Sequence, residues 1–199
     1  SPVKPAGIGC VVPIMKTLLL WDIDGTLINS GGAGMRALRT ALRDSFAIDG
    51  SLEDIDFAGR TDHWIMRRIF AKFGLTATED NFARFFSGYL AALPAELANP
   101  NAHVLPGIAD LLAATSAHDE IVQGLLTGNI RRGAEIKLGF HGLWQHFPFG
   151  AFADDSELRN DLGPHALRRA REHAGAEFAA GRIWVIGDTP HDIACGRTI

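Results

Sequence analysis

The alternation of short apolar runs with helical segments constrains the fold of this chain more than any other feature. Continuous apolar runs at 17–21, 121–127 and 182–187 are typical of strands buried on both faces of a parallel sheet. A further strand is predicted at 147–153. Helices are predicted between and before these later strands at about 108–117, 130–138 and 164–174. We therefore expect an α/β fold with a doubly wound, Rossmann-like parallel sheet.

A long helical block interrupts this alternation soon after the first strand. Residues 35–99 carry apolar side chains at helical spacing and no strand pattern, which predicts a bundle of three to five helices. We expect an all-helical cap at 30–103, inserted into a core formed by 15–29 and 104–199. Four aromatic side chains at helical spacing predict the apolar core of this cap rather than an aromatic binding site: Phe82, Phe85, Phe86 and Tyr89.

The two ends of the chain lie outside this pattern. Residues 1–14 contain three prolines and two glycines without a helix or strand period, and we interpret them as a leader or tag. The chain stops at Ile199, 11 residues after Asp188. The core is therefore expected to be truncated at its C-terminal end.

Polar side chains follow three of the predicted strands at their carboxyl ends. Asp22 and Asp24 follow the first strand, Thr127 ends the second, and Asp188 follows the last. Because ligands bind beyond the carboxyl ends of parallel strands, we expect these side chains to surround one cleft. Converging carboxylates repel each other, so a hard cation with oxygen ligands, such as Mg²⁺, is expected between them. The sequence has no HxH, HExxH or CxxC motif, which leaves little support for zinc or iron.

This set of residues suits phosphoryl transfer. Asp22, beside a cation, can attack phosphorus and form an aspartyl-phosphate. Asp24 can protonate the leaving oxygen and then activate the water that cleaves the intermediate. Loop amides and hydroxyls that can hold phosphate oxygens are offered by Gly25, Thr26, Gly128 and Asn129. One acid at a strand end is more often a helix cap, but the joint pattern favours a catalytic site.

Three motifs resemble those of the haloacid dehalogenase superfamily. DIDGTL at 22–27 is similar to the first motif of that family, LLTGN at 125–129 to its second, and GDTPHD at 187–192 to its fourth. The resemblance extends from about residue 16 to the end of the chain. The helical block is similar to the cap of the phosphoglycolate-phosphatase-like branch.

The resemblance implies a role for each acid. It implies that Asp22 is the nucleophile, Asp24 the general acid and base, and Thr127 a phosphate ligand. It also implies that Mg²⁺ is held by Asp22, the backbone carbonyl of Asp24, and Asp188. Asp192 would support Asp188 and a water on the metal.

The third motif departs from the family pattern. It is commonly a lysine before a helix start that contains proline, and the matching stretch at 158–164 offers Arg159 instead. Arginine supplies the same charge and can bind phosphate through two N–H groups, so we expect Arg159 to fill the role. Arg168 and Arg131 are alternatives, although each lies in a basic pair that is typical of a solvated surface.

The cap is expected to close over the cleft and to contribute to substrate choice. The polar stretch at 59–62, which precedes a predicted helix, is the candidate specificity loop. Arg60 in this loop either contacts an anionic group of the substrate or balances the charge of the following helix.

The leading interpretation is a Mg²⁺-dependent phosphatase that acts on a small phosphorylated metabolite. A phosphomutase of the β-phosphoglucomutase kind and a non-catalytic protein that binds a phosphorylated ligand are the alternatives. A dehalogenase is disfavoured, because its chemistry needs no acid at Asp24.

Composition limits the partners and the compartment. The net charge of −4 argues against a nucleic-acid-binding surface, and no apolar run is long enough to span a membrane. Cys10 and Cys195 cannot form the disulfide framework of a secreted domain. A cytoplasmic location is therefore expected.

Overall fold

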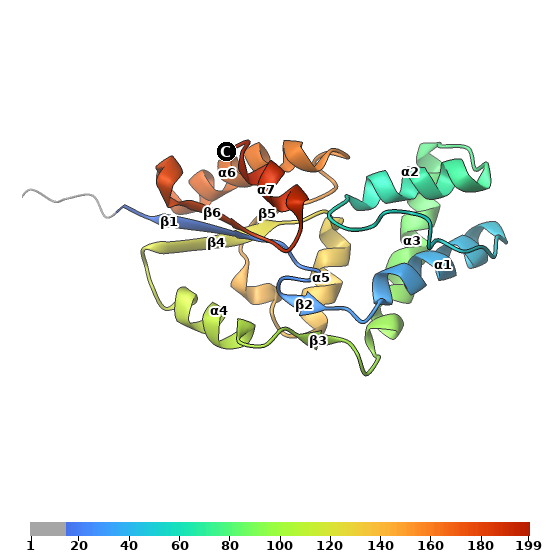
Figure 1. Cartoon of the computed structure of the whole chain (residues 1–199), viewed down its shortest axis with the longest axis horizontal. Coiled ribbons are helices and arrows are strands. Elements are labelled where there is room, and N and C mark those ends of the chain that lie inside the picture. Colours follow the sequence, from blue (N-terminus) through green and yellow to red (C-terminus); the bar gives the residue numbers. More distant parts are fainter. Residues whose placement is uncertain (1–14) are drawn as a thin grey trace, which may run out of the picture.

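The computed structural model describes residues 15–199, and the leader predicted at 1–14 lies outside the described residues. A four-stranded sheet forms the centre of the fold (Figure 1), with all strands parallel in the order β5-β4-β1-β6. Its strands are β1 Thr17–Trp21, β4 Ile121–Leu126, β5 Gly150–Ala151 and β6 Ile183–Ile186. The predicted parallel sheet is confirmed.

The strand predicted at 147–153 is shorter than expected. Only Gly150 and Ala151 pair with β4, at the edge of the sheet. Pro148 has no backbone N–H to donate, so strand pairing begins after it. The neighbouring Phe147 and Phe149 are nevertheless buried, which explains the apolar run in the sequence.

Helices cover both faces of the sheet. α6 (Leu162–Ala174) and α7 (Pro190–Gly196) lie on one face, and α4 (Ile108–Ser116) and α5 (Arg131–Phe140) lie on the other (Figure 1). Side chains of β1 alternate between these two layers. Leu18 and Leu20 pack with α6 and α7, whereas Trp21 packs with α4 and α5. The doubly wound α/β fold is therefore confirmed.

Three helices occupy the inserted block at residues 30–102. They are α1 (Ala33–Phe46), α2 (Asp62–Phe73) and α3 (Glu79–Leu97), and they lie beyond one end of the sheet (Figure 1). Their apolar sides form a third core, which also includes Ile130 and Ala153 of the α/β core. Phe85 and Tyr89 are buried in this core, and Phe82 and Phe86 pack against it.

A short antiparallel ribbon joins the helical block to the sheet. β2 (Ile28–Asn29) pairs with β3 (His103–Val104), with Ile28 opposite Val104. The chain leaves for α1 and returns from α3 through this ribbon. Two residues per strand are too few to produce a recognisable sequence pattern, which is why the ribbon was not predicted.

The described part of the chain, residues 15–199, contains no helix with the length and hydropathy that a membrane span requires.

Candidate active site

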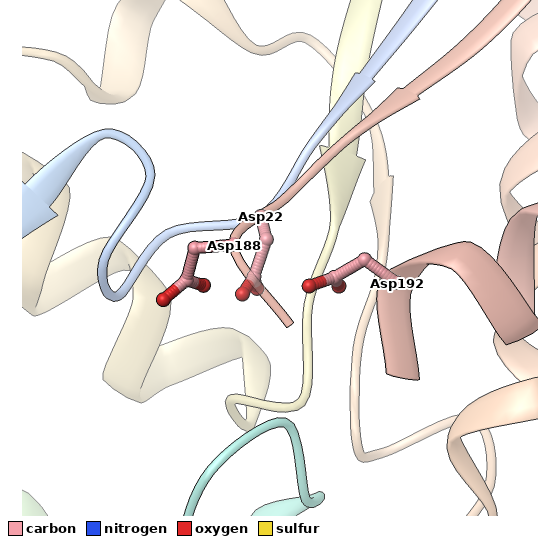
Figure 2. A group of neighbouring side chains, drawn as sticks. All are labelled: Asp22, Asp188 and Asp192. Atoms are coloured by element: carbon pink, nitrogen blue, oxygen red, sulfur yellow. The ribbon is translucent and has the colours of Figure 1, made fainter. Parts of the chain in front are cut away.

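Three carboxylates meet beyond the carboxyl ends of β1 and β6 (Figure 2). Asp22 directly follows β1, Asp188 lies in the loop after β6, and Asp192 lies in α7. One oxygen atom of each carboxylate lies within 4.8 Å of the others. Asp22 and Asp192 are buried, whereas Asp188 is exposed. Parallel strands thus bring together acids that are far apart in the sequence.

Arg159 partly balances the charge of this cluster. It opens the short η2 helix (Arg159–Asp161), its Nη2 lies 3.2 Å from Asp22 Oδ1, and it also donates to Asp192. Burial raises the pKa of Asp22 to about 6 against the lowering effect of Arg159, and the carboxylates of Asp192 and Asp24 add to the rise. Three carboxylates and one guanidinium leave a formal charge of −2. The oxygen donors and this charge fit a hard divalent cation such as Mg²⁺.

Asp192 is held by the protein on both of its oxygens. Its Oδ2 accepts hydrogen bonds from Thr189 N at 3.0 Å and Thr189 Oγ1 at 2.7 Å, which forms a capping box at the start of α7. Its Oδ1 accepts from Arg159. Asp192 therefore anchors α7 and orients Arg159 beside Asp22.

Asp24 has a lysine partner that the sequence interpretation missed. Lys137 Nζ in α5 lies 2.7 Å from Asp24 Oδ2 and 2.7 Å from Asn129 Oδ1, and its side chain is only 6% exposed. Burial alone would lower the pKa of Lys137, but the nearby Asp24 carboxylate raises it above the usual lysine value. Burial raises the pKa of Asp24, but Lys137 and a hydrogen bond from Asn129 outweigh burial and hold that pKa below its usual value.

One signal in the sequence pointed to Lys137. The buried stripe of α5 consists of Gly133, Ala134, Lys137 and Leu138. Lysine is almost never fully buried unless it is paired, so a lysine on the apolar stripe of a helix indicates an acidic partner. The position of that partner becomes clear only when α5 is placed against the loop after β1.

The Lys137→Met variant is expected to lower kcat with p-nitrophenyl phosphate by about ten- to a hundredfold, the equivalent of losing a hydrogen bond to a charged group. The reason is that Asp24 would lose the partner that fixes its carboxylate. Lys137→Arg, which keeps the charge, should retain more activity than Lys137→Met. Steady-state kinetics and thermal unfolding of both variants would check this. An unchanged kcat in a folded Lys137→Met protein would show that this ion pair has no catalytic role.

The loop after β4 is organised around Asn129. Its Nδ2 donates to Asp24 Oδ2 at 2.9 Å and to Thr127 Oγ1 at 2.9 Å. Thr127 is fully buried, and it does not line the cavity described below. Gly128 is pressed against the cap loop, because a Cβ there would overlap the backbone carbonyl of Arg60. A glycine is therefore required for this close approach.

The start of α2 contacts the core directly. Asp62 N donates to Gly128 O at 2.7 Å, and Ile130 N donates to Asp62 Oδ2 at 2.8 Å. Thr61 Oγ1 donates to Glu157 O at 2.5 Å. Burial raises the pKa of Asp62 to about 6, against the lowering effect of Lys137. Beside the predicted Arg60, the neighbouring Thr61 and Asp62 thus connect this loop to the α/β core by hydrogen bonds.

A cavity of about 370 Å³ lies between the helical block and the strand ends. The predicted site residues that line it are Asp22, Asp24, Arg60, Gly128, Asn129, Arg159 and Asp188. Those that do not line it are Gly25, Thr26, Thr127 and Asp192. Gly25 has a φ of 81°, and a Cβ there would overlap the Asp188 carboxylate.

The alternative arginines lie elsewhere. Arg168 pairs with Glu172 at 2.8 Å on the exposed side of α6. The Arg131 guanidinium lies over the Phe152 ring, 5.5 Å from its centroid. Neither of them lines the cavity, so Arg159 is the predicted third-motif residue that reaches the acids.

Comparison with protein families decides the identity of this arrangement. The sequence profile described as haloacid dehalogenase-like hydrolase matches residues 19–197, which is most of the chain. The chain belongs to the haloacid dehalogenase-like hydrolase family. The predicted resemblance and the hydrolase class are thereby confirmed. The matched residues include every residue that lines the cavity.

Relatives of this haloacid dehalogenase-like hydrolase include named phosphatases. It is 29% identical to a phosphoglycolate phosphatase from Rhodospirillum rubrum over 197 residues, covering 92% of this chain and 76% of the relative. It is 27% identical to the probable phosphatase IndB from Dickeya dadantii over 188 residues, covering 92% of this chain and 77% of the relative. The predicted enzyme class, a phosphatase of the haloacid dehalogenase type, agrees with both names.

Solved structures share the fold. The structure of CbbY from Rhodobacter sphaeroides in complex with phosphate matches with a TM-score of 0.72 at 18% identity, covering 92% of this chain and 83% of that one. A hydrolase from Pseudomonas syringae matches with a TM-score of 0.66 at 22% identity, covering 92% of this chain and 80% of that one. At these identities the likeness concerns the fold of the haloacid dehalogenase-like hydrolase alone.

Proposed function

We propose that this enzyme is a Mg²⁺-dependent phosphatase that hydrolyses a small phosphorylated metabolite through an aspartyl-phosphate at Asp22. The observation that carries the proposal is the convergence of Asp22, Asp188 and Asp192 at one end of a cavity, with Arg159 paired to Asp22 and Asp192. Asp24 lines the same cavity and supplies a second carboxyl group for proton transfer.

The first step is attack by Asp22 on phosphorus. A bond forms between an Asp22 carboxylate oxygen and phosphorus, and the bond from phosphorus to the alcohol oxygen breaks. Asp24 gives its proton to that alcohol oxygen, so the alcohol leaves uncharged. The charged phosphoryl group beside Asp24 raises the pKa of this carboxyl when substrate binds, because a like charge disfavours the ionised form.

The second step releases phosphate. Asp24, now ionised, takes a proton from a water molecule that attacks phosphorus, and the bond between phosphorus and Asp22 breaks. Lys137 and Asn129 keep the Asp24 carboxylate in place through both steps. Arg159 stabilises the negative oxygens of the phosphoryl group from the side of Asp22.

Mg²⁺ would be held by Asp22, the backbone carbonyl of Asp24, and Asp188. Asp192 would support Asp188 and a water on the metal. When bound, the cation offsets the negative charge of the phosphoryl group and of the acids. Asp188 suits this role because its carboxylate is exposed, lies beside Asp22, and makes no hydrogen bond within the described residues 15–199.

Metal dependence provides the test of this proposal. Phosphate release from p-nitrophenyl phosphate is expected to require Mg²⁺ and to stop after treatment with EDTA. Asp188→Asn should raise the Mg²⁺ concentration for half-maximal activity at least about tenfold, or roughly 1.4 kcal/mol, because one charged ligand is lost. Full activity in EDTA would contradict the proposed metal. A mutase would instead return the phosphoryl group to its product, which product analysis with a phosphosugar would reveal.

A further inference from the structure

Among the described residues, the one cation on the helical side of the cavity is Arg60, and it is paired with Asp56. We propose that this phosphatase takes phosphate monoesters of uncharged alcohols, in preference to esters that carry a second anionic group such as phosphoglycolate. The inference rests on the proposed phosphatase function and names the substrate class of the same cavity.

Beside the polar residues Ser30, Arg60 and Asp62, the helical block contributes an apolar wall to the cavity. This wall is formed by Met35 and Leu38 of α1, Phe57 of the following loop, Ile65 of α2 and Tyr89 of α3. Leu38, Ile65 and Tyr89 belong to the buried core of the block, so they form fixed walls. Among these five side chains the Tyr89 hydroxyl is the one hydrogen-bonding group. Hydrocarbon and hydroxyl groups of a substrate would be accommodated there.

The cations that line the cavity are already engaged. Lys137 pairs with Asp24, and Arg159 pairs with Asp22 and Asp192. Both lie at the phosphoryl end of the cavity, where they are needed for the charge of the transferring group. Within the described residues, the lining offers one further cation, Arg60.

Arg60 is turned towards its own loop. Its Nε and Nη2 donate to Asp56 Oδ2 at 3.1 and 3.0 Å, and its guanidinium lies over the Trp64 ring, 4.5 Å from the centroid. This ion pair joins residues four apart, and the ring of Trp64 fixes the plane of the guanidinium. The guanidinium is thus paired with Asp56, in the loop before α2, and this pair occupies the charge that a substrate anion would need.

The lining also carries an acid that opposes a second anion. Asp62 lines the cavity at the start of α2, next to the apolar wall, and its Oδ2 is bound to Ile130 N. A substrate carboxylate placed in this half would lie between a like charge and hydrocarbon. Burying an unpaired charge is strongly unfavourable, and a neighbouring carboxylate increases the penalty. An uncharged alcohol avoids both the cost of burying an unpaired charge and the repulsion by Asp62.

A matched pair of esters tests the inference. 2-Phosphoglycolate and 2-hydroxyethyl phosphate have the same chain length and differ in a carboxylate replaced by a hydroxymethyl group. We expect kcat/KM for 2-hydroxyethyl phosphate to exceed that for 2-phosphoglycolate by at least about tenfold. Equal values, or a preference for 2-phosphoglycolate, would overturn the inference and leave the phosphatase function standing. Failure to release phosphate from both esters and from p-nitrophenyl phosphate would overturn the phosphatase function and the inference together.

Variants test whether the charge of the cavity lining causes the preference between the two esters. Met35 is partly exposed at 37%, so Met35→Arg can place a cation in the apolar half without breaking the core. The ratio of kcat/KM should then shift towards 2-phosphoglycolate by at least about tenfold, whereas Met35→Leu should keep the wild-type ratio. A ratio that Met35→Arg does not move would contradict the inference. Arg60→Gln should change both esters to the same extent, and a selective loss for 2-phosphoglycolate would show that Arg60 binds an anion after all.

Discussion

Asp22→Asn is expected to lower phosphate release from p-nitrophenyl phosphate by at least about 10³-fold, because the amide cannot act as the nucleophile that forms the covalent intermediate. Asparagine has nearly the same shape as aspartate. It also removes a buried negative charge that is costly to keep, since burial raises the pKa of the Asp22 carboxyl to about 6. We therefore expect the variant to remain folded. Initial rates of p-nitrophenol release, measured beside thermal unfolding, would check both expectations.

An aspartate outside the site provides the matched control. Asp119 is exposed in the turn before β4, and it does not line the active-site cavity. Asp119→Asn makes the same chemical change and should keep wild-type activity. Substantial activity in a folded Asp22→Asn protein would rule out Asp22 as the nucleophile.

Asp24→Asn is expected to separate the two halves of the reaction. Loss of general acid and base catalysis should lower turnover of an alkyl ester by about 10²- to 10⁴-fold. p-Nitrophenolate leaves without a proton, so the first step with p-nitrophenyl phosphate needs no acid. The variant should therefore release a burst of p-nitrophenol and then stall, because no base activates the water of the second step. Stopped-flow absorbance would resolve the burst from the slow phase.

The conclusion depends on Asp24→Asn keeping the local structure. Asparagine can still accept the hydrogen bond that Lys137 donates to Asp24 Oδ2. The substitution removes the charge that pairs with the buried Lys137, however, so the midpoint of thermal unfolding should fall, and rates are compared at a temperature well below that midpoint. Equal losses for alkyl and aryl esters, with no burst, would contradict the assignment of Asp24 as the acid.

The sheet and the convergence of acids were readable in the sequence for a physical reason. The central strand β1 is apolar after its first residue, so its carboxyl end is marked sharply by the next polar residue, Asp22. β6 is an edge strand whose Trp184 is 58% exposed, yet its apolar run also ends just before Asp188. The edge strand β5 is shorter than its apolar run, because Phe147 is buried without pairing and Phe149 contributes only its carbonyl oxygen, which accepts from Leu125 N.

Contacts between separate elements were not readable. Lys137 reaches Asp24 across 113 positions of sequence, and Asp62 reaches Ile130 N across 68. Both contacts depend on how a helix is placed against a loop, and no local spacing encodes that placement. For Thr127, the sequence placed the residue at the right strand end, but whether its side chain faces the cavity depends on the conformation of the loop at Asn129.

The phosphorylated intermediate is the direct test of the carboxylate nucleophile. Asp24→Asn protein would be mixed with p-nitrophenyl phosphate and Mg²⁺, quenched in acid after the burst, and digested for peptide mass analysis. We predict that the peptide containing Asp22 gains the mass of one phosphoryl group, with the modification on that side chain. A burst of p-nitrophenol with Asp22 unmodified, or with the phosphoryl group on another residue, would contradict the proposed mechanism.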